Sequence, residues 1–282
     1  MKILFLGDVV GKAGRRAVSA ALPGLRARYA PSVVIANAEN SAGGIGLTRR
    51  TVRELLHSGV DILTSGNHTF AQKEAEQVVD EVPELLRPAN YPSGAPGRGW
   101  GVFPLAGGGT VGVLNLIGRT FMADLDCPFQ AADRLVPRLR EHTRAILVDM
   151  HAEATSEKQA MAHYLDGRVS VVIGTHTHVQ TADESIFEGG TAFLSDVGMV
   201  GPRHSVLGMR IDVAIRAFVT KMPTRLVAAR GEVLLCGAAV TVDEASGHAT
   251  HIERVQQVVT ERAMDGAGAD APDAVEALPG DA

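Results

Sequence analysis

Short runs of aliphatic and β-branched residues alternate along the chain with segments whose apolar residues have helical spacing. Runs of roughly four to eight such residues bounded by Gly, Asn or Asp are typical of buried strands, whereas the 3.6-residue period indicates helices. We expect strands at 3–6, 33–36, 61–64, 110–116, 145–149, 169–173 and 191–194, with another near residue 102. We expect helices at 11–28, 49–57, 72–82, 128–140 and 156–165. This alternation favours an α/β fold in which helices cover parallel strands.

Single residues refine the boundaries of these elements. Pro23, followed by Gly24, is expected to break or bend the first helix, because proline lacks the N–H that an interior helical position donates. Thr48 and Ser156 stand at the start of helical segments, and each is expected to cap its helix through the side-chain oxygen. The Pro- and Gly-rich segment 88–109 is expected to be irregular and to end in a hairpin turn. The later apolar runs, at 211–218, 233–239 and 252–259, are expected to form strands of the sheet or segments that cover it.

The chain shows neither an internal repeat nor a linker that would separate two globular units. Its 282 residues are 45% hydrophobic but only 4% aromatic, which predicts a core of Val, Leu, Ile and Ala. We therefore expect a single domain over residues 1–264. The remaining segment, 265–282, consists mainly of Ala, Gly, Pro and acidic residues and buries too little apolar surface to order itself, so we expect a flexible tail.

Charge, hydropathy and cysteine content limit the partners and the compartment. The formal net charge of −5 argues against a large surface for long nucleic acid and leaves room for a small anionic ligand. A local basic patch at Arg49 and Arg50 stays open as an alternative. No apolar run approaches the roughly 20 residues of a membrane span, and the amino terminus does not resemble a signal peptide. Because Cys127 and Cys236 are too few for a disulfide framework, we expect a soluble cytoplasmic protein without a membrane partner.

Side chains suited to metal binding or proton transfer follow five of the expected strands. In an open α/β sheet the carboxyl ends of the strands share one edge, where ligands bind. His176 and His178 are two residues apart, so on extended backbone their rings would point the same way. Acids, amides and imidazoles together form a mixed oxygen and nitrogen set sufficient for two metal ions. The residues at these strand ends are Asp8, Glu39, Asn40, Asn67, His68, His151, His176 and His178.

Each of these residues has an ordinary structural interpretation when it is taken alone. Asp8 would fit a helix cap, Asn67-His68 a turn, and the histidines of segment 176–178 a solvent-facing loop. Five such coincidences at successive strand ends are hard to explain as polar residues that are merely exposed at the surface. We therefore interpret the set as a metal centre.

Four of the motifs occur in the order in which they occur in a known superfamily. Over roughly the first 200 residues, the chain resembles the calcineurin-like metallophosphoesterases. The motifs that carry the resemblance are Gly7-Asp8, Gly66-Asn67-His68, Asp149-Met150-His151 and Gly174-Thr175-His176-Thr177-His178.

The chain also departs from the usual pattern of that superfamily. Val10 and Glu39 stand where a histidine and an aspartate are usual, and Thr69 replaces an acid that often follows the Asn-His pair. These departures resemble the bacterial YmdB-type branch, as do segments 43–48 and 196–202.

The resemblance implies a fold, an activity and a cofactor. The fold is an α/β sandwich in which two sheets pack face to face between flanking helices, a four-layer arrangement. The activity is hydrolysis of 2',3'-cyclic nucleotides, so the expected substrate is a small cyclic nucleotide. The cofactor is a pair of metal ions, for which the resemblance points to iron and leaves manganese as the alternative.

The motifs, carried over residue by residue, also imply which side chains hold the two ions. The Glu39 carboxylate would bridge both, because two oxygens of one carboxylate can hold cations about 3.5 to 4 Å apart. The first ion would be held by Asp8, Glu39, Asn40 and His178. The second would be held by Glu39, Asn67, His151 and His176.

The implied mechanism is attack of a metal-bridging hydroxide on phosphorus, in line with the leaving group. The leaving ribose oxygen must be protonated. His68 is expected to supply the proton, because it follows the ligand Asn67 but lies outside the metal shell.

Two other functions would use the same residues. A phosphomonoesterase or nuclease would need the same metals, since a metal centre recognises phosphate rather than the rest of the substrate. A regulatory protein would bind metal and nucleotide, turn over slowly and act through a partner. The sequence leaves the oligomeric state open, a homo-oligomer included.

Overall fold

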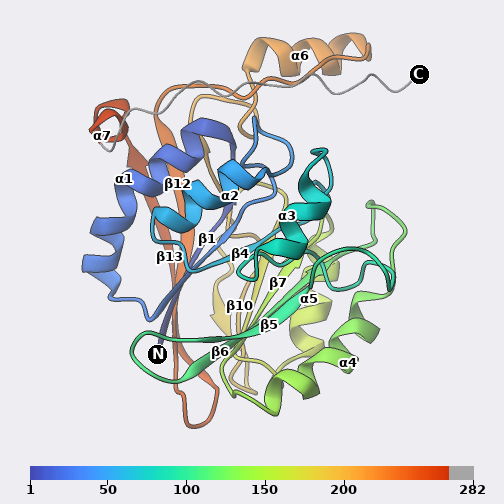
Figure 1. Ribbon diagram of the computed structural model, residues 1–282, viewed down its shortest axis with the longest axis vertical. Coiled ribbons are helices and arrows are strands. Elements are labelled where there is room, and N and C mark those ends of the chain that lie inside the picture. Colours follow the sequence, from blue (N-terminus) through green and yellow to red (C-terminus); the bar gives the residue numbers. More distant parts are fainter. Residues whose placement is uncertain (267–282) are drawn as a thin grey trace.

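The computed structural model describes residues 1–266, which form two β-sheets stacked between two groups of helices (Figure 1). Sheet A has the order β2 (Asp8–Val9), β11 (Met199–Pro202), β12 (Val233–Val242), β1 (Lys2–Leu6), β3 (Val33–Asn37), β4 (Ile62–Thr64), and β13 (Ala249–Val259) pairs with β12. Sheet B has the order β5 (Trp100–Pro104), β6 (Thr110–Ile117), β7 (Ile146–His151), β8 (Val171–Thr175), β10 (Ala192–Leu194), β9 (Ser185–Ile186).

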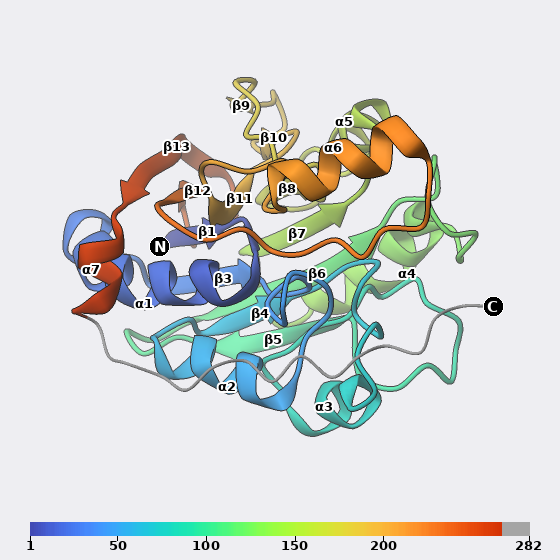
Figure 2. The same cartoon turned by 90° about the horizontal axis from the view of Figure 1, so that it is seen from above.

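Helices cover the outer faces of both sheets. Figures 1 and 2 show α1 and α4 on opposite sides of the stacked sheets, with the short α7 beside α1. The helices are α1 (Gly11–Tyr29), α2 (Arg49–His57), α3 (Ala75–Glu81), α4 (Pro128–Arg140), α5 (Thr155–Tyr164), α6 (Ile211–Thr220) and α7 (Glu261–Asp265). None of the helices within residues 1–266 is both long and apolar enough to cross a membrane.

Three hydrophobic clusters lie between the four layers. Alternate residues of strand β1 point to opposite faces of sheet A and so belong to two different clusters. Leu4 and Leu6 pack with α1 and α2 in the cluster outside sheet A, while Ile3 and Phe5 pack with sheet B residues in the cluster between the sheets. The third cluster lies between sheet B and helices α4 and α5. Fully burying a side chain of this size contributes about 1.5–3 kcal/mol. The prediction of a two-sheet, four-layer α/β fold is confirmed.

Parallel pairing brings the strand ends to one edge of the sandwich. In sheet A, β1 pairs parallel with β3 and β3 with β4. In sheet B, β7 pairs parallel with both β6 and β8. The two sets of carboxyl ends meet across the sheets, since the backbone N–H of His176, after β8, donates to Oδ2 of Asp8 in β2 at 3.2 Å.

Of three expectations about helix boundaries, the cap at Ser156 was wrong, the cap at Thr48 is confirmed, and of the break or bend expected at Pro23 the break does not occur. Helix α1 continues through Pro23 without a break, because Pro23 lies on the exposed face while Leu22 and Leu25 are buried against sheet A. Helix α5 begins at Thr155 and has no side-chain cap, so Ser156 does not serve as one. Thr48 does cap α2, in a capping box with Thr51.

The carboxyl-terminal third adds sheet A strands that the local pattern only partly defines. Segment 195–202, expected to be a loop, ends in β11, which pairs with both β2 and β12. The run 211–218 forms α6, which buries only Ala214, and the two later runs form β12 and β13. Of the expected tail at 265–282, residues 267–282 lie outside the described residues.

Candidate metal centre

All seven side chains expected to bind metal lie where strand ends of the two sheets meet. Sheet A contributes Asp8 from β2, Glu39 and Asn40 after β3, and Asn67 after β4. Sheet B contributes His151 at the end of β7, with His176 and His178 after β8. Asp8, Glu39, Asn40 and His151 are buried, and the other three are partly exposed.

The four residues expected around the first ion form a connected chain of contacts. The Asn40 amide Nδ2 lies 3.1 Å from Oε1 of Glu39 and 3.2 Å from Nε2 of His178. The same imidazole nitrogen lies 3.8 Å from Oδ1 of Asp8. The Asn40 oxygen is the atom that would bind a cation, and a half-turn of the amide presents it to the same neighbours.

The four residues expected around the second ion gather about the ring of His151. Its Nε2 lies 2.8 Å from Oδ1 of Asn67, 3.1 Å from Nδ1 of His176 and 3.4 Å from Oε1 of Glu39. Because Oε1 of Glu39 contacts both Asn40 and His151, this carboxylate stands between the two groups.

His176 and His178 reach the centre by a route that differs from the one expected. Strand β8 ends at Thr175, and both histidines have left-handed backbone, with φ of 102° and 66°. The expectation that extended backbone would align the two rings was therefore wrong. A tight turn, rather than the pleat of a strand, directs both rings to the centre.

Each imidazole has one nitrogen in the centre and the other held by a partner outside it. Nδ1 of His151 lies 2.9 Å from Oγ1 of Thr175, Nδ1 of His178 lies 3.0 Å from the carbonyl of Leu207, and Nε2 of His176 lies 3.0 Å from the carboxylate of Glu153. Such partners fix the orientation and tautomer of metal-binding histidines.

Sequence reasoning missed several of these supporting residues. Asn37 donates through Nδ2 to Oδ2 of Asp149 and to the carbonyl of Ser65, and it accepts from the backbone N–H of Glu39 through Oδ1. Oγ1 of Thr175 donates to the other Asp149 oxygen at 2.7 Å. The position of Asn37 at the end of β3 was an available signal, whereas the support from Glu153 has no local pattern.

The centre concentrates charge that burial disfavours. Burial raises the pKa of Asp8 to about 6, against the lowering influence of His178 and His151. Burial also opposes ionisation of Glu39, but the charge and hydrogen bond of His151 hold the Glu39 pKa well below its usual range. Burial opposes protonation of His151 as well, yet Glu39 raises the pKa of that imidazole. Buried carboxylates of this kind require a neighbouring positive charge.

The residues present fit a metal cation. Oδ1 of Asp8 is buried and has no hydrogen-bond partner within residues 1–266, so one carboxylate oxygen is available to a ligand. Ligand atoms of Glu39, His151 and His176 lie within 4.8 Å of one another. Burial lowers the pKa of His176 to about 4, which keeps that imidazole neutral, as a metal ligand must be.

His68 lies beside these residues rather than among them. Its backbone N–H donates to Oε2 of Glu39 at 2.9 Å, and its Nε2 lies 3.2 Å from Nδ2 of Asn67. The side chain is partly exposed, unlike those of Glu39 and His151.

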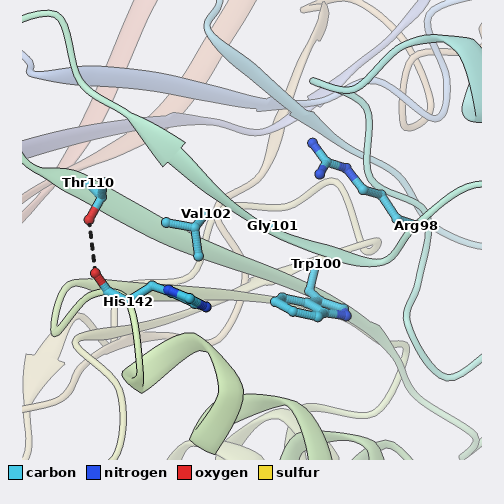
Figure 3. Close-up of a pocket in the computed structure, with 6 residues that line it drawn as sticks. All are labelled: Arg98, Trp100, Gly101, Val102, Thr110 and His142. Atoms are coloured by element: carbon cyan, nitrogen blue, oxygen red, sulfur yellow. Dashed lines mark hydrogen bonds between the residues drawn. The ribbon is translucent and has the colours of Figure 1, made fainter.

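A separate hollow of about 560 Å³ lies at the edge strand β5. There, Oγ1 of Thr110 donates to the carbonyl of His142 at 3.3 Å (Figure 3). The lining residues are Arg98, Trp100, Gly101, Val102, Thr110 and His142, none of which belongs to the centre. This hollow is therefore not the metal site.

Two stacked sheets with acids, amides and imidazoles gathered where their strands end define a metallophosphoesterase-type hydrolase. A family model described as "YmdB-like protein" matches residues 4–255. The chain belongs to the YmdB-like family, as the resemblance of its motifs predicted.

Relatives agree with this assignment over nearly their whole length. A 2',3'-cyclic-nucleotide 2'-phosphodiesterase of Bacillus subtilis is 47% identical over 90% of this chain and 96% of its own. A crystal structure of a hypothetical protein from Thermus thermophilus is 41% identical, with a TM-score of 0.86 over 92% of this chain and 99% of its own. A crystal structure of a phosphatase from Mycoplasma pneumoniae is 34% identical, with a TM-score of 0.86 over 94% and 96%.

Proposed function

We propose that this protein is a dimetal phosphodiesterase that hydrolyses 2',3'-cyclic nucleotides. The observation that carries the proposal is the cluster of Glu39, His151 and His176 beside an Asp8 oxygen that is buried without a hydrogen bond within residues 1–266. The name of the Bacillus subtilis relative, at 47% identity, supports the substrate class.

The contacts support a division of the ligands between two ions, with iron as the proposed metal and manganese as the alternative. Glu39 would bridge the ions, since its carboxylate contacts a residue of each group. When bound, such a metal pair withdraws charge from phosphoryl oxygens and lowers the pKa of water. The first ion is assigned to Asp8, Glu39, Asn40 and His178, and the second to Glu39, Asn67, His151 and His176.

The chain's own residues would orient the phosphate and move one proton. Opening a 2',3'-cyclic phosphate leaves a negative ribose oxygen that needs a proton, and Nε2 of His68 is the proposed donor. Its partial exposure and its position beside Asn67 support this role. Thr175, Leu207 and Glu153, the partners of the other histidines, hold those rings in place, so the rings remain available as ligands rather than as acids.

Charge and cysteine content support a small substrate and a cytoplasmic location. With a net charge of −5, the protein is not expected to hold long nucleic acid, and it needs no membrane partner in this role. Cys127 and Cys236 are both free. We take the cytoplasm as the proposed compartment because free thiols persist there.

The test is elemental analysis of the purified protein together with activity on a substrate panel. The panel contains 2',3'-cyclic nucleotides, 3',5'-cyclic nucleotides, linear dinucleotides and phosphomonoesters. We expect two metal ions per chain and turnover of the 2',3'-cyclic compounds. Activity confined to monoesters would contradict the proposal and favour the phosphatase activity for which the Mycoplasma pneumoniae structure is named.

A further inference from the structure

A buried ion pair lies directly behind the metal centre and is not part of it. Nζ of Lys158, on α5, lies 2.7 Å from Oδ2 of Asp196, in the segment between β10 and β11. The two side chains are only 1% and 2% exposed. Burying two charges costs free energy that a solvent-exposed pair would not, so the fold retains this pair against a penalty.

The backbone is shaped to let the lysine reach the aspartate. Lys158 passes Gly174, where a Cβ would lie 2.8 Å from Cδ of Lys158 and 1.8 Å from the carbonyl oxygen of Ser195. A side chain at position 174 would therefore collide with both the Ser195 carbonyl and the stem of Lys158. Gly174 lies in β8, one residue before the strand ends at Thr175, and leaves room for both neighbours.

The carboxylate of Asp196 also accepts hydrogen bonds from the backbone of two segments, one after β8 and one before β11. Its Oδ2 accepts from the N–H of Thr177 at 3.0 Å, and its Oδ1 accepts from the N–H of Gly198 at 2.8 Å. Thr177 lies between His176 and His178, the two residues with left-handed backbone. Left-handed backbone is unfavourable for residues other than glycine, so this turn needs an external contact to persist.

We propose that Asp196 is the positioning residue for the His176–His178 turn and that Lys158 neutralises its buried charge. The inference rests on the proposed function, because it concerns the same metal centre. Within residues 1–266 the Asp196 carboxylate contacts Lys158, the Thr177 N–H and the Gly198 N–H but none of the seven proposed ligand side chains, so it acts through the Thr177 N–H. Without Lys158, its carboxylate would add a further buried negative charge near Asp8.

The test compares two double variants of equal side-chain shape. Lys158→Met/Asp196→Asn removes both charges but keeps an oxygen that accepts from Thr177, whereas Lys158→Met/Asp196→Leu removes the acceptor as well. The readouts are the Mn²⁺ dissociation constant by competition with a chelator, and the Tm of the metal-free protein. We expect the Asn variant to bind within about tenfold of wild type and the Leu variant to bind at least about tenfold more weakly than the Asn variant.

The outcomes separate this inference from the proposed function. Equal Mn²⁺ affinity of the two variants, or a difference that merely follows their metal-free Tm values, would overturn the positioning role. If the Leu variant does not fold, the Asn variant decides alone, and more than tenfold loss of affinity in that variant overturns the proposal. Wild-type protein that binds no Mn²⁺ or iron would instead refute the metal centre itself.

Discussion

His68 is the residue whose role separates catalysis from metal binding. The His68→Ala variant should keep both metal ions and lose activity on 2',3'-cyclic substrates by about 10² to 10⁴, the usual contribution of a general acid. The physical reason is that the imidazole of His68 lies beside Asn67 and is not one of the clustered ligand atoms. Metal content and turnover are measured on the same preparation.

The matched control is His251→Ala, because His251 is an exposed histidine on β13. That variant should keep both metal and activity. Loss of the metal ions from the His68→Ala protein would assign this residue to the ligand shell and contradict the proposed division of roles.

At Gly66 the backbone packs so closely against the metal centre that no larger residue fits. A Cβ at Gly66 would lie 2.2 Å from Nε2 of His151. Gly66→Ala should therefore displace that ring, weaken metal binding and destabilise the fold by about 1–3 kcal/mol through overpacking. Denaturant unfolding and chelator competition measure the two effects, and a variant with wild-type metal affinity would contradict this interpretation.

At the scale of residues, the sequence predicted which side chains meet but not how they are held. The seven expected ligands form one connected set of contacts, because each lies at or near the end of an apolar run that the sequence marks as a strand. The left-handed backbone of His176 and His178 was not predictable, since these residues rarely adopt it. The support from Glu153 and Asp196 depends on contacts between segments distant in sequence.

Among the elements, α2 offers the sharpest test of a helix boundary. Thr48→Ala removes the side-chain acceptor for the Thr51 N–H and should destabilise the protein by about 0.5–2 kcal/mol. The exposed Ser156 makes no cap in α5, so Ser156→Ala should change stability by less than about 0.5 kcal/mol. Urea unfolding of both variants checks the difference, and equal effects would contradict the assigned caps.

Helix α1 contains a glycine at a position where no packing contact requires one. Gly24 is exposed within the helix, and a Cβ there would have no heavy atom within 4 Å. Gly24→Ala should therefore stabilise the protein by about 0.5–1 kcal/mol, since alanine loses less backbone entropy on folding. A destabilised variant would show that the helix is distorted next to Pro23.

The elements that sequence misjudged are those in which tertiary packing overrides local preference. Pro23 does not end α1, because burial of Leu22 and Leu25 on the opposite face outweighs one lost hydrogen bond. Strand β11 was expected to be a loop because its glycines carry no strand preference. Pairing with β2 and β12 supplies the structure that the local sequence does not specify.

For the molecule as a whole, the centre gathers side chains from both sheets, which also meet through the apolar cluster between them and through the hydrogen bond from Asn37 in β3 to Asp149 in β7. Removing the metal with a chelator should lower the Tm, and returning Mn²⁺ or iron should restore it. At a metal concentration about 100 times the dissociation constant, the expected stabilisation is about 2.7 kcal/mol. Calorimetry of metal-free and loaded protein makes the comparison, and a Tm independent of metal would contradict a centre shared by both sheets.

The arrangement of the two sheets was accessible only through family resemblance. Local patterns give the strands but not their order, and β12 lies between β1 and β11 although more than 200 residues separate it from β1 in sequence. Register between such distant strands depends on which faces bury together, as with Phe5 between the sheets. Periodicity within a window cannot supply this information.

The division of the ligands between the two sheets also bears on how the chain folds. Asp8, Glu39, Asn40 and Asn67 come from one sheet and the three histidines from the other, so neither sheet alone contains either proposed metal set. A refolding chain must pair distant segments before the set is complete, which is slow compared with forming local helices. The ability to capture a metal ion should therefore appear only at the last stage of refolding, when the sheets dock. The rate of metal uptake would then report the rate of that final step.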